Sequence, residues 1–252
     1  MHRENWQQTG NQILDLLAPP ERETLLASAE VVSLDHGFEV YSPEGPIFHV
    51  YFPIRGVFSA TVAMREGNHA EALPIGNEGM AGLDAYWGLD FSTARVVSQI
   101  PGEVLRLSVH SLHEAIAASP KLDELLRRYT SFALCAANQT VACNALHSSE
   151  QRICRWLLGA HDRAAADRFP LTHEFLAELL GVRRQTVTVV AGLLQKQNLI
   201  HYRRGAVEVV NRAGLEAAAC ECHATLQALY ERIMQAPLVT PAPVEQSLST
   251  NG

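Results

Sequence analysis

Residues 171–209 read LTHEFLAELLGVRRQTVTVVAGLLQKQNLIHYRRGAVEV, and this stretch decides the fold. Thr172 can cap a first helix that carries leucines at helical spacing and ends at Gly181. A second helix follows directly, again with one apolar face. Two short alternating runs then flank Arg203-Arg204-Gly205, a composition typical of a tight hairpin. Helix, turn, helix and a two-stranded wing together predict a winged helix-turn-helix.

The cations of this stretch point to DNA as the partner. Arg183 and Arg184 stand at the start of the second helix, where the helix dipole disfavours a cation by about 0.3–1 kcal/mol unless an anion or a base edge lies beyond it. Helix-turn-helix proteins insert this end into the major groove, where arginine pairs with guanine and glutamine with adenine, and a basic wing tip meets phosphates. The expected DNA contacts are Thr172, Arg183, Arg184, Gln185, Thr188, Arg203 and Arg204. A pair of helices with a solvated basic end is the competing interpretation, which the ordered succession of all four elements disfavours.

The distribution of charge supports an interaction with a polyanion. The chain of 252 residues has a net charge of −7, which by itself is unusual for a nucleic-acid binder. Residues 1–149 hold 9 Lys and Arg against 17 Asp and Glu, whereas residues 150–212 hold 10 against 6, a local net charge of +4. A basic segment between acidic ones gives a localised footprint on DNA.

At these residues the sequence resembles the Crp/Fnr transcriptional regulators, whose DNA-binding half has the pattern L-T-x-E-x-L-A-x-L-L-G-V-x-R-x-T-V. The matching positions are Thr172, Glu174, Leu176, Ala177, Gly181, Arg184, Thr186 and Val187. The resemblance implies that Arg184 and Gln185 read bases, and that the partners are double-stranded DNA, a second copy of the chain and RNA polymerase. The chain departs from the family at Arg183, where a serine often caps the recognition helix, and at Val189, where some members carry a further arginine.

The first half of the chain has the composition of a β-rich domain. After helical turns in residues 1–28, strands are expected at 31–32, 39–41, 48–53, 57–62, 71–74 and 96–99, with glycines at the turns. This is roughly the 8–12-residue spacing of a compact sandwich or barrel. The resemblance implies the β-roll of the family's sensor domain, which is similar to cyclic-nucleotide-binding domains. The expected fold class is therefore α+β: an N-terminal β-roll, a long dimerisation helix and a C-terminal winged helix-turn-helix.

The family's phosphate cradle combines a glycine-glutamate turn with a later arginine followed by Ser or Thr, groups that hold a phosphate and a ribose. Here Ser92 stands where that arginine is expected, and Arg95 comes three positions later. On a strand this shift turns the Arg95 side chain to the opposite face, so cyclic AMP is not the expected ligand. Two alternatives remain: an empty structural roll, or a pocket for another small-molecule effector. The residues that would line such a pocket are Gly76, Glu78, Gly79, Gly82, Ser92 and Thr93.

Residues from Pro120 to about His147 should form one long helix, with Ser119 as its cap. An apolar stripe along it advances in alternate steps of three and four residues, the spacing of a coiled-coil seam. The residues expected at a dimer interface are Leu122, Leu125, Tyr129, Phe132, Ala136, Gln139, Cys143 and Leu146. The resemblance implies that this helix is the dimer axis. Alternatively the helix packs on the β-domain of its own chain, which also requires an apolar stripe.

The five cysteines do not suggest a disulfide framework, and their spacing does not suggest a metal site. Cys220, Cys222 and His223 are close in sequence, but zinc and iron–sulfur sites use four ligands, and no second close pair accompanies them, although Cys143, His147 and Cys154 are present. No metal is therefore expected, and the cofactor is left open. A redox- or metal-responsive regulator that uses its cysteines remains an alternative. Known catalytic motifs are missing from the sequence, so an enzymatic role is not expected.

Four segments are expected: a sensor domain over 1–118, a dimerisation helix over 119–148, a winged helix-turn-helix over 149–214, and an extension over 215–252. The extension should contain a helix from Leu215 to Met234 and a disordered Pro/Ser-rich tail. No run approaches the length of a membrane span and the N-terminus is polar, so a cytoplasmic location is expected. The sequence thus predicts a homodimeric Crp/Fnr-type regulator that reads a palindromic operator. A β-roll binding module that regulates an enzyme without binding DNA is the alternative from another class.

Overall fold

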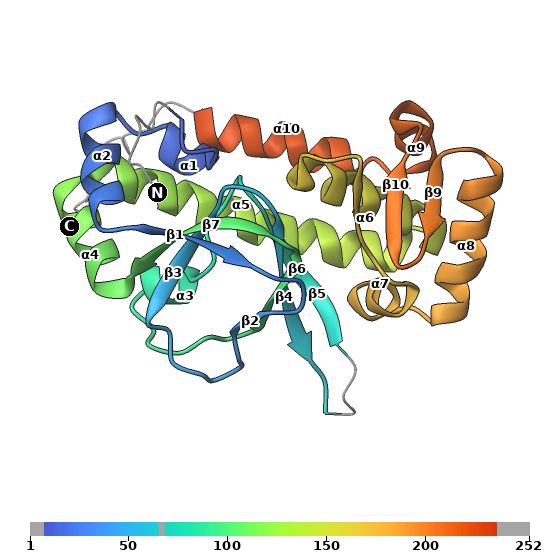
Figure 1. Ribbon diagram of the computed structural model, residues 1–252, viewed down its shortest axis with the longest axis horizontal. Coiled ribbons are helices and arrows are strands. Elements are labelled where there is room, and N and C mark those ends of the chain that lie inside the picture. The colour runs from blue at the N-terminus through green and yellow to red at the C-terminus, as the bar shows by residue number, and fades with distance from the viewer. Residues whose placement is uncertain (1–7, 66–68, 236–252) are drawn as a thin grey trace, which may run out of the picture.

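The computed structural model describes residues 8–65 and 69–235, and its elements lie along one long helix (Figure 1). The N-terminal part is a roll of two antiparallel sheets. One sheet has the order β1–β7–β3, made of Glu30–Leu34, Gly102–Ser108 and His49–Pro53. The other has the order β2–β6–β4–β5, made of Glu39–Tyr41, Arg95–Ile100, Val57–Ala63 and His69–Ile75. Both sheets contribute to one buried core, which contains Phe52, Phe58 and Met80.

Four helices accompany the roll: α1 (Gln12–Asp15), α2 (Pro19–Ala27), α3 (Leu83–Tyr86) and α4 (Val109–Ala118). The six strands expected from the sequence are present, whereas β7 and α4 were not predicted. The strand passes into the helix without an intervening glycine or proline, and Ser108 both ends β7 and caps α4 by accepting a hydrogen bond from the Ser111 amide. A junction of this kind lacks the glycine or proline that commonly separates two elements, and only the capping serine marks it.

The long helix α5 spans Pro120–Leu146, and Ser119 caps it by accepting a hydrogen bond from the Leu122 amide, as predicted. The stripe expected at a dimer interface instead packs against the chain's own roll and against the C-terminal helix α10 (Cys222–Gln235). Six of its residues are at most 5 % exposed: Leu122, Leu125, Tyr129, Phe132, Ala136 and Cys143. Of the other two, Gln139 hydrogen-bonds Cys222 and Leu146 is exposed. The assignment of this stripe to a dimer interface is therefore corrected, because the roll supplies the apolar partner that the periodicity requires.

The C-terminal domain begins with α6 (Ser149–Ala164), α7 (His173–Leu180) and α8 (Arg184–Lys196). Its wing has three strands in the order β8–β10–β9, made of Arg168–Pro170, Ala206–Val209 and Ile200–Arg203. The third strand, β8, was not predicted from the sequence, which indicated a wing of two strands. Arg204 and Gly205 have φ values of 52° and 74°, the two positive angles that a two-residue hairpin turn requires. The winged helix-turn-helix predicted from the sequence is present.

The chain continues beyond the wing as α9 (Arg212–Ala218) and α10. One helix from Leu215 to Met234 was predicted, but the structure has two, with a break at residues 219–221. Helix α10 lies along α5 and α6 (Figure 1), and it adds Met234 and Tyr230 to the core of the roll. The predicted disordered tail, residues 237–252, lies outside the described residues.

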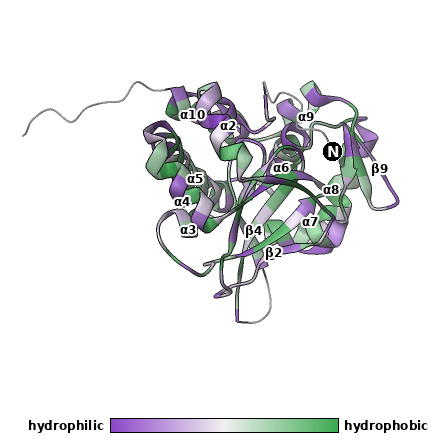
Figure 2. Cartoon of the chain, turned by 60° about the vertical axis from the view of Figure 1, so that its left-hand side comes forward, coloured by the Kyte–Doolittle hydropathy of each residue, from purple (hydrophilic) through white to green (hydrophobic). Residues whose placement is uncertain are grey.

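The winged domain also contacts the roll. Val57 and Ile100 of the roll belong to the same apolar core as α6, α7 and α8, and α7 lies beside β5. Hydrophobic and hydrophilic residues are mixed along the helices of both parts of the chain (Figure 2). None of the helices in the described part of the chain is both long and apolar enough to cross a membrane.

Candidate DNA-reading surface and effector cavity

The N-terminal turn of α8 faces solvent. Arg183, Arg184, Gln185 and Thr188 are all exposed, whereas Val187 and Leu194 on the opposite face are completely buried in the domain core. Arg183 is the residue before the helix, and its side chain caps no backbone amide. The helix therefore lacks the side-chain cap that a serine at this position would supply. The amide groups of the first turn and the cations beside them therefore point outward together, an arrangement that suits an anion or a base edge.

His173, at the start of α7, was not singled out in the sequence and lies against this surface. Its Nδ1 is 3.0 Å from the hydroxyl of Thr188, and that hydroxyl donates to the carbonyl of Arg184. Burial, together with the nearby Arg184 cation, lowers the pKa of His173. A neutral imidazole adds no positive charge beside Arg184, so it orients Thr188 without repelling the arginine. Thr172 caps α7, accepting a hydrogen bond from the Phe175 amide at 3.1 Å.

The wing presents Arg203 and Arg204 at its exposed tip. Two hydrogen bonds of Tyr202 hold the hairpin against the helices: its hydroxyl donates to the Leu171 carbonyl, and its amide donates to Gln195 Oε1 at 3.0 Å. The basic tip and the outward turn of α8 are thus fixed to one small domain, as a DNA reader requires.

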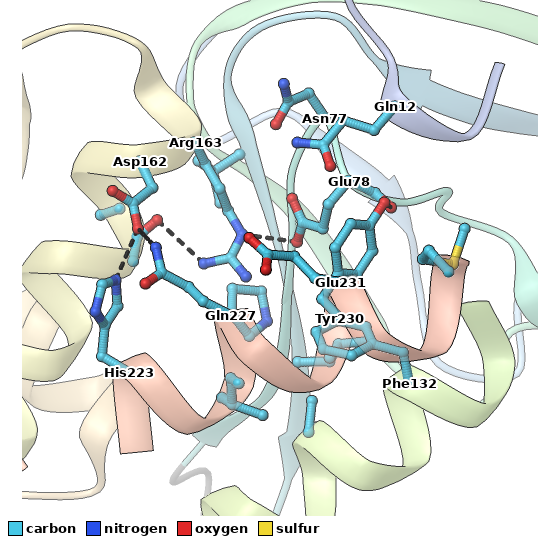
Figure 3. Close-up of a pocket in the computed structure, with 18 of the residues that line it drawn as sticks. Gln12, Asn77, Glu78, Phe132, Asp162, Arg163, His223, Gln227, Tyr230 and Glu231 are labelled. Atoms are coloured by element: carbon cyan, nitrogen blue, oxygen red, sulfur yellow. Dashed lines mark hydrogen bonds and ion pairs between the residues drawn. The ribbon is translucent and has the colours of Figure 1, made fainter. Parts of the chain in front are cut away.

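A cavity of about 520 Å³ lies between the roll, α5, α6 and α10 (Figure 3). Apolar walls come from Phe132, Trp156 and Leu226, and charged and neutral polar side chains line the remainder. Its volume is that of a site for a small organic molecule.

Two interactions across this cavity join the roll to α6. Glu78 forms an ion pair with Arg163 at 2.7 Å, and a side chain at Gly76 would collide with Arg163, which explains the glycine there. On β5, Glu71 accepts hydrogen bonds from Ser59 at 2.6 Å and from the Trp156 ring nitrogen at 3.0 Å. Burial raises the pKa of Glu71. The wall of the cavity is therefore shared between the sensor and winged domains.

The residues expected to line an effector pocket are not brought together in this cavity. Of the six, only Glu78 lines it. Ser92 hydrogen-bonds the Ala94 carbonyl and Thr93 hydrogen-bonds Asp84, so both stabilise a local turn. The Arg95 side chain points to the surface and forms an ion pair with Glu39 at 2.7 Å. It therefore faces away from the expected pocket, as its position on a strand predicts. The walls supplied by α6 and α10 could not be found from the sequence because they are contributed by distant segments.

Four possible metal ligands meet at the end of α5. The ligand atoms of Cys143, His147, Cys220 and Cys222 all lie within 4.8 Å of one another. The expectation that the cysteines lack a full ligand set is therefore corrected: the two pairs are more than seventy residues apart in sequence, and the fold joins them. His223, included with the cysteines in the sequence analysis, instead pairs with Asp162 at 2.7 Å.

The chain has two parts, a roll and a winged helix-turn-helix whose second helix begins with exposed arginines. The family model of the Crp-like helix-turn-helix domain matches residues 151–218, which span α6 through α9. The chain therefore carries a Crp-like helix-turn-helix domain, joined to a roll as in solved structures of Crp/Fnr family regulators.

Solved structures support the same architecture. FixK2 from Bradyrhizobium japonicum superposes with a TM-score of 0.64 at 18 % identity, covering 76 % of this chain and 98 % of its own. A putative transcriptional regulator of the Crp/Fnr family from Eubacterium rectale gives 0.63 at 13 % identity, covering 84 % and 99 %. TTHA1359, a Crp/Fnr family regulator from Thermus thermophilus, gives 0.62 at 23 % identity, covering 75 % and 98 %. At these identities the likeness establishes the fold. No curated protein matches the sequence.

Proposed function

We propose that the chain regulates transcription by binding DNA sequence-specifically through α8. The observation that carries this proposal is the outward N-terminal turn of α8, where Arg184 and Gln185 are exposed side by side above a buried inner face. Each can make a bidentate contact to a base edge in the major groove, worth about 1–3 kcal/mol of discrimination. Arg203 and Arg204 on the wing supply phosphate contacts that position the reader but do not specify sequence. RNA polymerase remains the further partner that the resemblance implies.

We infer that the functional unit is a homodimer joined along the outer face of α5. Leu134 and Val141 are 64 % and 70 % exposed there, and with the exposed Asn138 and Ala145 they advance in steps of four, three and four residues. This is coiled-coil spacing, in which a single asparagine in the seam fixes the register. Trp87 hydrogen-bonds Thr130 at the flank of this face and enlarges its apolar area.

A second copy of the chain is the occupant that this pattern fits. A two-fold axis along α5 would place like residues opposite one another, so the small Ala145 and the apolar Val141 would each meet their own counterpart. Two copies of α8 would then face two half-sites one helical turn apart, and the operator would be a palindrome.

We further propose that the cavity binds a small effector other than cyclic AMP. The position of the family's phosphate-binding arginine is taken by Ser92, which is buried and hydrogen-bonded within its own turn. Glu78, the counterpart of the ribose-binding glutamate, is neutralised by Arg163. A ligand with apolar and charged parts would contact the roll, α5, α6 and α10 together. It would shift the relative position of the two domains only if it bound one of two such positions more tightly than the other.

The experiment is a selection from random duplexes at two salt concentrations with the wild type, Arg184→Ala and Arg232→Ala. Arg232 is an exposed arginine of α10, away from the reader, and serves as the matched control. We expect an enriched palindrome that weakens with salt, survives Arg232→Ala and is lost with Arg184→Ala. Weak binding without an enriched sequence, both in buffer and with cell extract added as a source of effector, would contradict the proposal.

A further inference from the structure

The cluster at the end of α5 has the donor set of a metal centre. Cys143 lies in the last turns of α5, and His147 is the residue that ends this helix. Cys220 lies in the break between α9 and α10, and Cys222 is the first residue of α10. The Sγ atoms of Cys143 and Cys220 are 3.6 Å apart, and Cys222 Sγ is 3.5 Å from His147 Nδ1. Three thiols and one imidazole nitrogen thus converge on one point.

These separations fit a tetrahedron around a single ion. Zinc–sulfur bonds of about 2.3 Å and zinc–nitrogen bonds of about 2.0–2.1 Å give edges of about 3.8 Å between two sulfurs and about 3.5 Å between sulfur and nitrogen. The two measured separations lie close to these edges. An iron–sulfur cluster would hold its cysteines further apart, because several iron and sulfide ions lie between them.

The surroundings of the four donors have the features of an outer shell. His147 presents Nδ1 to the cluster while its Nε2 is 3.3 Å from the carboxylate of Glu221, the arrangement by which a carboxylate orients a metal-binding histidine. Gln139 donates its side-chain amide to Cys222 Sγ at 3.0 Å. The contact between Cys222 and His147 is therefore held on both sides by polar groups, Gln139 on the cysteine and Glu221 on the histidine.

A buried cation lies beside the cluster. Arg152 is only 8 % exposed, and its Nε has no hydrogen-bond partner among the described residues. The carbonyl of Gln151, the residue before it, lies 4.0 Å from Cys220 Sγ. A buried guanidinium with an unpaired donor requires an anion nearby. Zinc bound by three thiolates and one neutral imidazole would carry a net charge of −1 and would supply it.

We propose that Cys143, His147, Cys220 and Cys222 bind one zinc ion as a closed, four-ligand structural site. On binding, the three thiols release their protons and each sulfur forms one bond to the metal. All four positions are filled by the protein, so no open position is left for a substrate or a metal-bound water.

The position of the site gives it a structural consequence. It ties the end of α5 to the segment between α9 and α10, and Arg152, which neighbours the cluster, donates to the Leu180 carbonyl at the end of α7. Zinc would therefore fix the winged domain relative to α5. The expectation that this fixation supports operator binding rests on the proposed function. The existence of the metal site is independent of the proposed function.

The test begins with the full chain purified under reducing conditions from zinc-supplemented cells. We expect one zinc per chain by mass spectrometry, and an X-ray absorption spectrum with three sulfurs at about 2.3 Å and one nitrogen at about 2.0–2.1 Å. Cobalt substitution should give the intense visible bands of tetrahedral thiolate coordination. Protein without zinc, or a first shell without sulfur, would overturn the proposal.

Variants separate the site from general folding effects. Cys222→Ser should abolish zinc binding, whereas Cys135→Ser and Cys154→Ser, at free cysteines outside the cluster, should retain it. Glu221→Gln alters only an exposed side chain, and it should weaken zinc binding by about 10- to 100-fold in competition with a chelator. Equal zinc loss in the Cys135→Ser control, or unchanged affinity in Glu221→Gln, would contradict the assigned ligands or their outer shell.

The link to DNA is measured separately on the selected duplex, with and without zinc. Weaker binding after zinc removal supports the fixation of the winged domain. Unchanged binding would refute that role and leave the metal site standing. Failure of every zinc-loaded form to select a sequence would instead count against the proposed function.

Discussion

The inner and outer faces of α5 carry apolar residues at the same helical spacing, yet different surfaces cover them. On the inner face, Leu125 and Tyr129 are completely buried against the roll of their own chain. On the outer face, Leu134 and Val141 are 64 % and 70 % exposed. Spacing identifies a face that must be buried, but it does not identify the neighbour that buries it.

Composition separates the two faces where spacing cannot. The first half of the inner stripe carries large side chains, which fill the core of the roll, whereas the outer stripe consists of Leu134, Asn138, Val141 and Ala145. A single asparagine within an apolar stripe sets the register between two helices. The following predictions test this division.

The largest effect is expected on the inner face. Leu125→Ala should lower the free energy of unfolding by about 2–5 kcal/mol, because it leaves a cavity in the core, while self-association of the folded protein should not change. Urea denaturation measures the first quantity and sedimentation the second. If Leu125→Ala instead abolished the dimer without lowering the free energy of unfolding, Leu125 would belong to the dimer interface.

A charge on the outer face should affect assembly without affecting the fold. Val141→Glu places like charges opposite each other across the two-fold seam and should weaken dimerisation by about 2–4 kcal/mol. Sedimentation equilibrium gives the constant, and circular dichroism should show an unchanged fold. Ala117→Glu, at an exposed alanine of α4, is the control. An unaltered dimer in Val141→Glu would show that the outer face is not the seam.

The wing offers a test of whether two chains read one operator. Arg204→Ala removes one phosphate contact per chain, so on a palindrome it should weaken binding for all sequences alike and reduce the slope of log K against log salt by about two. A fluorescence titration at several salt concentrations measures the slope, with Arg232→Ala as the reference. A reduction of about one would indicate a single bound chain, contrary to the dimer.

The smallest effect concerns Glu71, on the cavity wall opposite the inner face of α5. Burial raises its pKa in the folded state, so ionisation costs more in the folded than in the unfolded chain. Its contribution to stability is therefore lost as the pH rises from the ordinary pKa of a glutamate through the raised pKa. Glu71→Gln should flatten the pH dependence of unfolding across this window. An identical pH profile in the variant would show that folding does not raise the pKa of Glu71.

The winged domain was predictable because its signals are local. Thr172, Gly181 and the Arg204-Gly205 turn specify caps and angles through their own residues and immediate neighbours, and the structure has each of them in the expected role. The outward orientation of Gln185 follows from the burial of Val187, which comes two residues later and therefore lies on the opposite side of the helix. Arg184 is exposed as the first residue of this helix.

The remainder depends on contacts between distant segments. The burial of the inner face of α5, the walls of the cavity and the pairing of Cys143 with Cys220 each join parts of the chain that a short sequence window does not contain. The junction of β7 and α4 was missed for a different reason, since Ser108 serves both elements and leaves no boundary residue between them.

The most direct test of sequence reading by α8 is a position-by-position binding profile of the selected duplex. Each base pair is changed in turn, and the affinities of the wild type and Arg184→Ala are compared. We predict that the variant becomes indifferent to one symmetric pair of positions, where the wild type loses about 1–3 kcal/mol, and keeps its preferences elsewhere. A variant that is weaker by the same factor at every position would show that Arg184 contacts phosphate, and the assignment of α8 as the base reader would be contradicted.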